Sequence, residues 1–224
     1  MGSLYIINLE NKVFFAFLRL RWRLSTRQFN AMFDLLFKNI ERKIEITEED
    51  KAFCKTLFIP KKLRKKQYLL QAGDISEYVA FVNKGLLRSY SVDEKGEEHI
   101  IQFAPEDWWI TDMNSFLTCE EAIYNIDALE DTEILLLDKP SQDKLFEQIP
   151  KFERYFRILI QASFVAMHKR LLSTITNTAE EKYMRMLKTY PDLVQRVPQH
   201  MIASFLGIKP ETISRIRKKQ ASNS

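Results

Sequence analysis

Hydrophobic and polar residues alternate with two different periods along this chain, and the change of period divides it into regions. Between residues 32 and 44, apolar residues recur every three or four positions and predict an amphipathic helix: Phe33, Leu36, Phe37, Ile40 and Ile44. Thr47-Glu-Glu-Asp50 has the form of a capping box, which predicts a second, short helix through Leu57. Pro60 follows that helix and ends it.

From residue 62 to 138 the period shortens, and brief apolar runs are separated by turn-forming residues. The predicted strands are residues 68–70, 78–82, 86–92, 98–103 and 133–137. Glycine-containing turns lie at residues 72–74, 83–85 and 93–96, and the last of these has the composition of a hairpin tip. Short strands with a turn about every ten residues predict a β-sandwich or barrel.

The longest helical stretch extends from Glu147 to Thr176 and is apolar on two sides. One face carries Tyr155, Ile158, Ala162, Val165 and Leu172, and the other carries Phe152, Phe156, Ile160, Phe164, Met167 and Leu171. A helix that is apolar on two sides requires two partners. The β-domain can cover one face and the same helix of a second chain the other, which makes residues 147–176 the predicted dimerisation helix, with the first of these two faces as its dimer face. The alternative is burial of both faces within one subunit.

After a helix over residues 179–189 and a Tyr190-Pro-Asp break, the chain predicts two short helices joined by a tight turn. Pro198 and Pro210 suit the first turns of these helices, and Gly207 stands where the first helix must stop. A small shared core is expected from Ile202, Ala203, Leu206, Ile208, Ile213 and Ile216. This is the layout of a helix-turn-helix, whose second helix enters the DNA major groove. The alternative is a structural helical hairpin with a solvated basic face.

The composition of the chain mainly excludes certain classes of protein and site. The 224 residues are 46% hydrophobic and 29% charged, with a net charge of +4, which permits nucleic acid without indicating it. Residues 209–219 nevertheless hold five basic residues and one acidic residue. The two cysteines are far apart and the three histidines are scattered. A disulfide scaffold, a metal site and an iron–sulfur cluster are therefore not expected, and the cysteine usage suits the cytoplasm.

Residues 1–31 differ from the rest and are predicted to be an atypical N-terminal extension. Residues 13–24 are apolar, but they are shorter than a membrane span and contain three arginines. The order of charge and apolar residues does not fit a signal peptide, so no membrane partner is expected. The segment is either an amphipathic surface helix or sequence upstream of a start at Met32, and we favour the second.

The order of helix, β-barrel, long apolar helix and helix-turn-helix resembles the Crp/Fnr superfamily of bacterial transcription regulators from about residue 35 to 219. Three motifs carry the resemblance: Leu70-Gln-Ala-Gly-Asp74, Val82-Asn-Lys-Gly-Leu-Leu-Arg88 and Glu211-Thr-Ile-Ser-Arg215. The last matches the Glu-x-x-Ser-Arg readout pattern of the Fnr-like branch. The resemblance implies an α+β chain with a cyclic-nucleotide-binding-type β-roll or jelly-roll sensor domain (residues 32–146), the dimerisation helix, and a helix-turn-helix domain (residues 177–224).

The resemblance also implies a function: a homodimeric, sequence-specific DNA-binding regulator, not an enzyme. Its expected partners are a second copy of the chain, inverted-repeat double-stranded DNA with TTGA-like half-sites, and RNA polymerase. Base readout falls to Glu211 on cytosine, Arg215 on guanine, and Ser214 near the base edges. Phosphate contacts are expected from Lys209, Thr212, Arg217 and Lys218.

The ligand pocket departs from the family pattern. Cyclic-nucleotide binders of the family use an arginine for the cyclic phosphate, but that position falls on Glu121 or Ala122, and no arginine lies between Arg88 and Arg154. A buried phosphate without a cationic partner is poorly compensated, so cyclic AMP is not expected in the usual mode and any effector is an unknown small molecule. This degenerate pocket is expected to be lined by Trp108, Trp109, Asp112 and Tyr124, although aromatic pairs also serve in core or lid packing.

Two further functions stay open. A ligand-sensing or protein-interaction module with the same fold, which no longer binds DNA, would show no salt-dependent DNA affinity. A cupin-like barrel enzyme would need a cluster of histidines and carboxylates on the strands, and His99 is the only histidine in the β-region.

Overall fold

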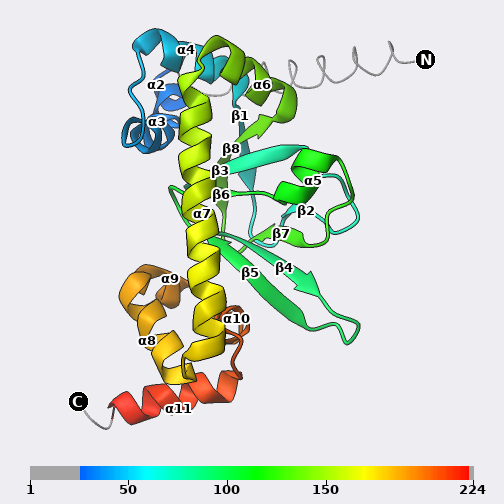
Figure 1. Cartoon of the computed structure of the whole chain (residues 1–224), viewed down its shortest axis with the longest axis vertical. Helices are drawn as coiled ribbons and strands as arrows, with labels where there is room; N and C mark the ends of the chain where they lie inside the picture. The colour runs from blue at the N-terminus through cyan, green and yellow to red at the C-terminus, as the bar shows by residue number, and fades with distance from the viewer. Residues whose placement is uncertain (1–25, 222–224) are drawn as a thin grey trace.

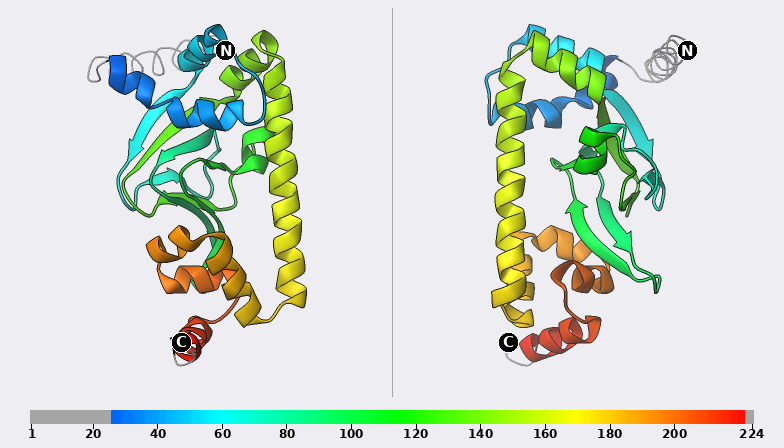
Figure 2. Two further views of the ribbon diagram at one scale, coloured as in Figure 1. Left: turned by 90° about the vertical axis from the view of Figure 1, so that its left-hand side faces the viewer. Right: turned by 45° about the vertical axis from the view of Figure 1, so that its right-hand side comes forward.

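A computed structural model describes residues 26–221 and is organised around one long helix, α7 (Lys151–Thr176), as Figure 1 shows. One end of α7 lies in a cluster of helices, its middle runs beside two antiparallel sheets, and its other end reaches the C-terminal helical domain. The views in Figure 2 place the sheets on one side of α7 and leave its opposite side uncovered. The predicted α+β class and order of elements are confirmed.

The N-terminal helices are α2 (Thr26–Ala31), α3 (Asp34–Glu41) and α4 (Glu48–Leu57). The capping box that opens α4 is confirmed, because Thr47 Oγ1 accepts from Asp50 N at 3.2 Å and Asp50 Oδ2 accepts from Thr47 N at 2.8 Å. The helix predicted over residues 32–44 is shorter than expected and ends at Glu41. Residues 26–31 of the predicted extension are helical, and the rest of that segment lies outside the described residues.

Two four-stranded sheets pack face to face to form the β-roll. The first has the order β1-β8-β3-β6 and the second β2-β7-β4-β5, and each pair of neighbouring strands is antiparallel. The strands are β1 (Ile59–Leu63), β2 (Tyr68–Leu70), β3 (Tyr78–Lys84), β4 (Leu87–Val92), β5 (Glu98–Ala104), β6 (Trp109–Ile110), β7 (Asn125–Ala128) and β8 (Thr132–Asp138). The five predicted strands are confirmed. β1, β6, β7 and the short helix α5 (Met113–Thr118) were not predicted, since these short segments show no clear alternation.

Both outer faces of the β-roll are covered. Along β8, Ile134 and Leu136 point between the sheets, while Leu135 and Leu137 pack against the N-terminal helices and α7. The interior between the sheets is filled by aliphatic side chains from both sheets. The outer face of the second sheet shares a third core with the C-terminal domain. The β-roll therefore lies between two helical layers, and its second sheet connects it directly to the C-terminal domain.

Gly85, in the turn between β3 and β4, is required by both its conformation and its surroundings. Its φ is +97°, and a Cβ there would lie 2.5 Å from Thr132 Oγ1 and 2.8 Å from the Asp131 carbonyl oxygen. We expect Gly85→Ala to lower the free energy of unfolding by about 2–5 kcal/mol, from backbone strain and overpacking together. Gly96→Ala is the matched control, because its φ is +81° but nothing lies within 4 Å. Urea denaturation measures both variants, and equal losses would contradict the steric part of this prediction.

Helix α6 (Lys139–Gln148) precedes α7, so the long helix begins later than predicted. The single helix expected from Glu147 is interrupted at Ile149 and Pro150, and α7 starts at Lys151. Proline lacks an N–H, which places it before or within the first turn of a helix. Among the described residues, no helix is both long and apolar enough to cross a membrane.

The C-terminal domain consists of α8 (Ala179–Thr189), α9 (Pro191–Arg196), α10 (Gln199–Leu206) and α11 (Pro210–Ala221). The bounds predicted for α8 are confirmed, and Thr178 with Glu181 forms a capping box at its start. Helix α9 was not predicted, because Tyr190-Pro-Asp was interpreted only as a break. Pro191 instead occupies the first turn of α9.

Candidate nucleic-acid interface

Helices α10 and α11 form the predicted helix-turn-helix. Gly207 has a φ of +63°, and its N–H donates to the Ser204 carbonyl at 3.1 Å, which ends α10 in the expected left-handed conformation. Pro210 is the first residue of α11, as predicted. Pro198 differs slightly, since it is the N-cap of α10 and not part of its first turn. The expected core residues are buried or half-buried: Ile202, Ala203, Leu206, Ile208, Ile213 and Ile216.

The two sides of α11 differ in burial. Ile213 and Ile216 point into the shared core, whereas all three predicted base-reading residues are exposed: Glu211, Ser214 and Arg215. Residues three and four positions apart share a face of a helix, so these side chains form one continuous exposed surface. Arg215 Nη2 lies 3.4 Å from Thr212 Oγ1, one turn before it. The Arg215 guanidinium is thus held by the Thr212 hydroxyl and not by the Glu211 carboxylate.

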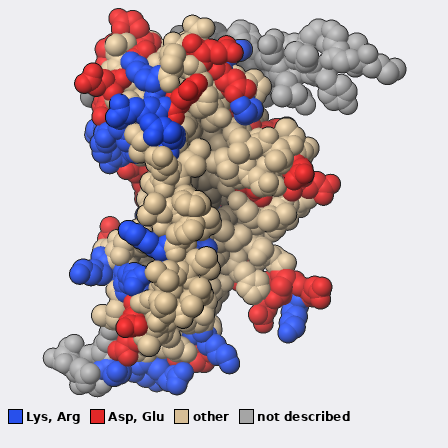
Figure 3. Space-filling model, viewed as in Figure 1, with Lys and Arg blue, Asp and Glu red and all other residues tan. Residues whose placement is uncertain are grey.

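The predicted phosphate-contacting residues surround this surface. Lys209, Arg217 and Lys218 are exposed, and Thr212 is half-buried beside Arg215. Figure 3 shows basic side chains along α11 at the end of the molecule opposite the N-terminal helices. An exposed basic face along the second helix of a helix-turn-helix has the polarity that binding to a phosphate backbone requires.

The long helix α7 is covered most fully near its start, and Ser173 near its end is also buried. The prediction that Tyr155 belongs to a dimer face is wrong, because Tyr155 is fully buried and its hydroxyl donates to Asn39 Oδ1 at 2.8 Å. Burial raises the pKa of Tyr155 above its usual range. Ile158 is half-buried, while Ala162, Val165 and Leu172 are exposed. Burial of both apolar faces within one subunit, the alternative, is also wrong.

The exposed apolar surface of α7 includes residues that were assigned to the other face. Its large exposed side chains are Ile160, Phe164, Val165, Met167, Leu171, Leu172 and Ile175. Phe164, Leu171 and Ile175 are seven and four positions apart, which is a heptad signal that could have identified this surface from sequence. Side chains this large and apolar rarely remain together in water, so this surface requires a cover.

The two tryptophans of the predicted ligand pocket lie in different surroundings. Trp109 packs beside Phe58, Phe81 and Phe156, and its indole N–H donates to the Tyr155 hydroxyl at 3.0 Å. It is therefore part of the core between the first sheet and α7. Trp108 lies on the other side and meets the Tyr190 ring edge-on at 5.8 Å between centroids. The alternative of core packing is correct for Trp109.

Asp112 and Tyr124 do lie close together, but their polar groups are already used. Asp112 is buried, and its carboxylate accepts from Ser115 N at 3.1 Å and Ile123 N at 3.3 Å, which caps α5 and fixes the following loop. Tyr124 donates to the Thr111 carbonyl at 3.2 Å. Burial, followed by the nearby Asp112 charge, raises the pKa of Tyr124 to about 12. These contacts are structural and leave the Asp112 carboxylate engaged with its own loop.

A buried arginine elsewhere in the roll was not singled out by sequence reasoning. Arg88, on β4, is 6% exposed and faces the C-terminal domain, away from the roll interior. Its Nε and Nη2 bind the two carboxylate oxygens of Asp127 at 2.8 and 3.0 Å, and it also pairs with Glu98. The guanidinium lies 4.0 Å from the centre of the Tyr90 ring. Arg88 directly follows Leu87 on β4, and successive side chains of a strand point to opposite faces. Because Leu87 faces the roll interior, the sequence could have indicated that Arg88 points outward.

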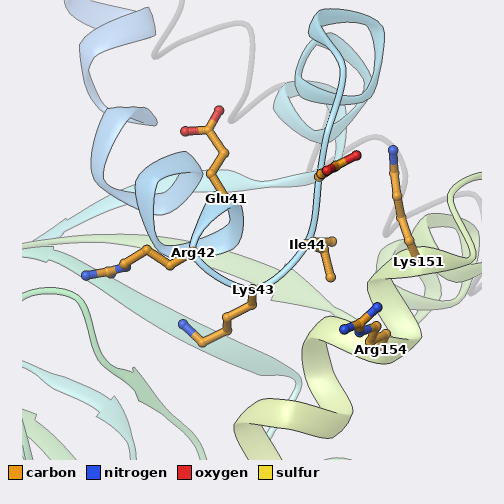
Figure 4. A pocket seen from close by; sticks show the side chains of 7 residues that line it. Glu41, Arg42, Lys43, Ile44, Lys151 and Arg154 are labelled. Carbon is orange, nitrogen blue, oxygen red and sulfur yellow. The ribbon is translucent and has the colours of Figure 1, made fainter.

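One hollow in the described part of the chain has a volume of about 540 Å³ and lies where the α3–α4 loop meets the start of α7 (Figure 4). Three of its four basic side chains have partners. Arg42 donates to Asp107 at 2.7 Å, Lys151 pairs with Asp50, and Lys43 donates to Asn39 Oδ1 at 3.0 Å. Burial, and then the Arg42 charge, lower the pKa of Lys43. Most of the basic groups around the hollow are therefore paired with residues of the protein itself.

The hairpin tip after β4 is confirmed, and it brings together three groups that sequence spacing did not connect. Ligand-type atoms of Asp93, Glu97 and His99 lie within 4.8 Å of one another on the exposed tip. Asp93 Oδ1 accepts from the N–H groups of Lys95 and Glu97, and Asp93 Oδ2 lies 2.9 Å from His99 Nε2. These contacts close the tip, which accounts for the grouping without a metal ion.

Comparison with known proteins agrees with this arrangement. A family model described as "Cyclic nucleotide-binding domain" matches residues 60–149. The transcriptional activator protein anr of Pseudomonas aeruginosa is 25% identical over 166 residues, covering 69% of this chain and 67% of that protein. The regulatory protein HlyX of Actinobacillus pleuropneumoniae is 25% identical over 168 residues, covering 70% of this chain and 69% of that protein.

A solved structure shares the fold. FixK2 from Bradyrhizobium japonicum superposes with a TM-score of 0.64 at 18% sequence identity, covering 74% of this chain and 85% of that chain. At that degree of identity, the likeness shows a shared fold alone. Of the two sequence relatives, one is named a transcriptional activator and the other a regulatory protein.

Proposed function

This chain belongs to the Crp/Fnr superfamily of transcription regulators, and we propose that it binds inverted-repeat double-stranded DNA as a homodimer. The observation that carries the proposal is the exposed face of α11, where Glu211, Ser214 and Arg215 lie opposite the buried Ile213 and Ile216. A helix presented in this way can enter the major groove with its core residues behind it and its polar residues toward the bases.

The residue types on this face define what the helix reads. Arg215 can donate two hydrogen bonds to guanine O6 and N7, and Glu211 can accept from the amino group of cytosine. Ser214 lies between them and contacts neighbouring base edges. Lys209, Thr212, Arg217 and Lys218 bind phosphates, which adds affinity and salt dependence without sequence preference. Together these contacts favour TTGA-like half-sites, as the family pattern implies.

A homodimer supplies two such helices. The exposed apolar surface of α7 is the best candidate for the contact between copies, since burying it against its own equivalent removes both surfaces from water. A twofold dimer places its half-sites about one helical turn apart. Acting on chromosomal DNA places the protein in the cytoplasm, and RNA polymerase is the partner through which a bound regulator would act on transcription.

The residues of the sensor domain do not favour binding of cyclic AMP in the usual mode. The Asp112 carboxylate is used to cap α5, Glu120 and Glu121 follow that helix, and Arg88 is committed to Asp127 outside the roll interior. An anionic phosphate placed beside these carboxylates would be repelled without a guanidinium to compensate it. If an effector exists, its chemistry differs from that of a cyclic nucleotide.

Fluorescence anisotropy with an inverted-repeat TTGA probe and a scrambled probe tests this function. We expect Arg215→Ala and Glu211→Ala each to remove about 1–3 kcal/mol of discrimination per half-site, because a base contact is lost on both halves. Arg217→Ala is the control: it weakens binding to both probes equally and reduces the salt dependence. Unchanged site preference in both base-reading variants contradicts the residue assignment, and absence of salt-dependent affinity in the wild type contradicts DNA binding itself.

A further inference from the structure

The helix-turn-helix domain packs directly against its own β-roll, in addition to being connected to it by the polypeptide chain. Phe103 on β5 and Phe205 on α10 pack with their ring centroids 5.3 Å apart and their planes tilted by 51°, within a core that both domains share. Helix α10 lies beside β5, as Figure 2 shows. Domains joined by a small polar contact usually move relative to one another, whereas a shared apolar core holds them. The position of α11 is therefore set partly by the roll.

A serine of α10 fixes the register of this contact. β5 is the edge strand of its sheet, so its outward N–H and C=O groups lack a strand partner. Ser204 Oγ accepts from Ile100 N at 2.9 Å and donates to the Glu98 carbonyl at 2.8 Å. One hydroxyl thus satisfies two backbone groups of the edge strand, and α10 cannot slide along β5 without losing both hydrogen bonds.

An arginine of α9 holds the domain at a second point. Arg196 Nη1 and Nη2 bind the two carboxylate oxygens of Glu106 at 2.8 and 3.0 Å, and Nη2 also pairs with Glu130. Glu106 Oε1 in turn accepts from Gly85 N at 2.8 Å. The guanidinium thus joins α9 to two separate loops of the roll, and a forked pair of this kind fixes orientation as well as distance.

The long helix takes part in the same junction. Arg170 on α7 donates to the Ile101 carbonyl of β5, and its guanidinium lies 4.8 Å from the centre of the Phe205 ring on α10. Only Asn177 and Thr178 separate α7 from α8. The helix that would form the dimer axis is therefore connected to the recognition domain through β5 as well as through the chain.

We propose that Ser204 and Arg196 are positioning residues for DNA binding: by fixing the helix-turn-helix on the β-roll, they set the separation of the two α11 helices and hence the half-site spacing that the dimer selects. This inference rests on the proposed function. Both side chains contact the β-roll and lie on helices other than α11. Because the contacts form within the protein alone, the selected spacing requires no bound effector.

The test is binding to probes that carry the same two half-sites with the spacer shortened or lengthened by up to two base pairs. Two base pairs rotate one half-site by about 70° around the duplex axis, which a rigid dimer cannot follow. We expect the wild type to prefer one spacing at least 10-fold over probes two base pairs longer or shorter. In Ser204→Ala and Arg196→Met, this preference falls to about 3-fold or less, while discrimination between correct and scrambled half-sites stays unchanged.

The controls separate a positioning role from a loss of stability. Arg196→Lys keeps the charge but loses the fork, and it should recover part of the spacing preference. Lys62→Met breaks an exposed ion pair between Lys62 on β1 and Glu133 on β8, away from the helix-turn-helix domain. It should leave the spacing preference at the wild-type value. Thermal unfolding checks each variant, and Ser204→Ala, which removes a single oxygen, provides the test if Arg196→Met does not fold.

The outcomes are distinct from those for the proposed function. A wild type that ignores all inverted repeats overturns the proposed function and this inference with it. A wild type that selects one spacing, with both variants keeping the same selectivity, overturns only the inference. Loss of spacing preference together with half-site discrimination also overturns it, because the residues then act on the recognition helix itself.

Discussion

A chain carrying Phe164→Glu and Leu171→Glu is expected to be monomeric and to lose the affinity advantage of an inverted repeat over a single half-site. Both side chains are more than half exposed on α7, at 56% and 59%, and they lie on one face because they are seven positions apart. In a twofold dimer each substitution occurs twice, so four apolar side chains are replaced by charges that would have to lose their hydration.

The size of this effect follows from the burial that is lost. Each fully buried Phe or Leu side chain contributes about 1.5–3 kcal/mol, so removing four weakens the dimer by more than about 1000-fold. Sedimentation at micromolar concentration measures the oligomeric state, and anisotropy measures DNA affinity. Lys144→Glu with Gln148→Glu on α6 is the matched control, since both residues are exposed and outside this surface. A double variant that stays dimeric would show that α7 is not the contact between copies.

What the sequence predicted well was local. The Thr47 capping box, the bounds of α8 and the left-handed Gly207 each depend on residues within a few positions of one another. Backbone hydrogen bonding and φ preference are then nearly sufficient to fix the structure. The hairpin tip at residues 93–96 belongs to the same class, because the Asp93 carboxylate caps its own turn.

What the sequence did not reveal depends on contacts between distant segments. Trp109 was assigned to a ligand pocket because its neighbours in sequence resemble one, yet its indole N–H meets Tyr155, 46 positions later. Tyr155 was wrongly assigned to the dimer face for the same reason, since it contacts residues that are distant in sequence. Ser204 and Arg196 gave no signal at all, since a serine in an amphipathic helix and an arginine at a helix end are ordinary until β5, Glu106 and Glu130 are placed beside them.

The distribution of polar groups in the β-roll explains how a sensor-type fold can hold the recognition domain in one position. The space between the sheets is filled by aliphatic side chains, while the buried Arg88–Asp127 ion pair lies on the outer face beneath α10. Buried ionic groups stabilise little by themselves, but they fix one arrangement because any other leaves a charge unpaired. The strands that face the recognition domain are therefore held more specifically than an apolar surface alone would hold them.

Breaking this outer network is expected to give the largest loss of stability from a single side chain. Arg88 and Asp127 are each only 6% exposed, and their two hydrogen bonds join β4 to β7 while Glu98 extends the network to β5. Asp127→Ala leaves the guanidinium buried with one half-exposed partner. Removing one member of a buried pair costs about 3–5 kcal/mol, which urea denaturation would report as a lower midpoint.

Removing both charges should be less harmful than removing one. Arg88→Met with Asp127→Leu leaves no uncompensated charge, so we expect a smaller loss than for Asp127→Ala alone, despite two substitutions instead of one. Glu133→Ala, which breaks the exposed pair with Lys62, is the control and should cost about 1 kcal/mol or less. If the double variant loses as much stability as the sum of its two single variants, the charges do not act as a pair, and the network does not hold the second sheet in the way we infer.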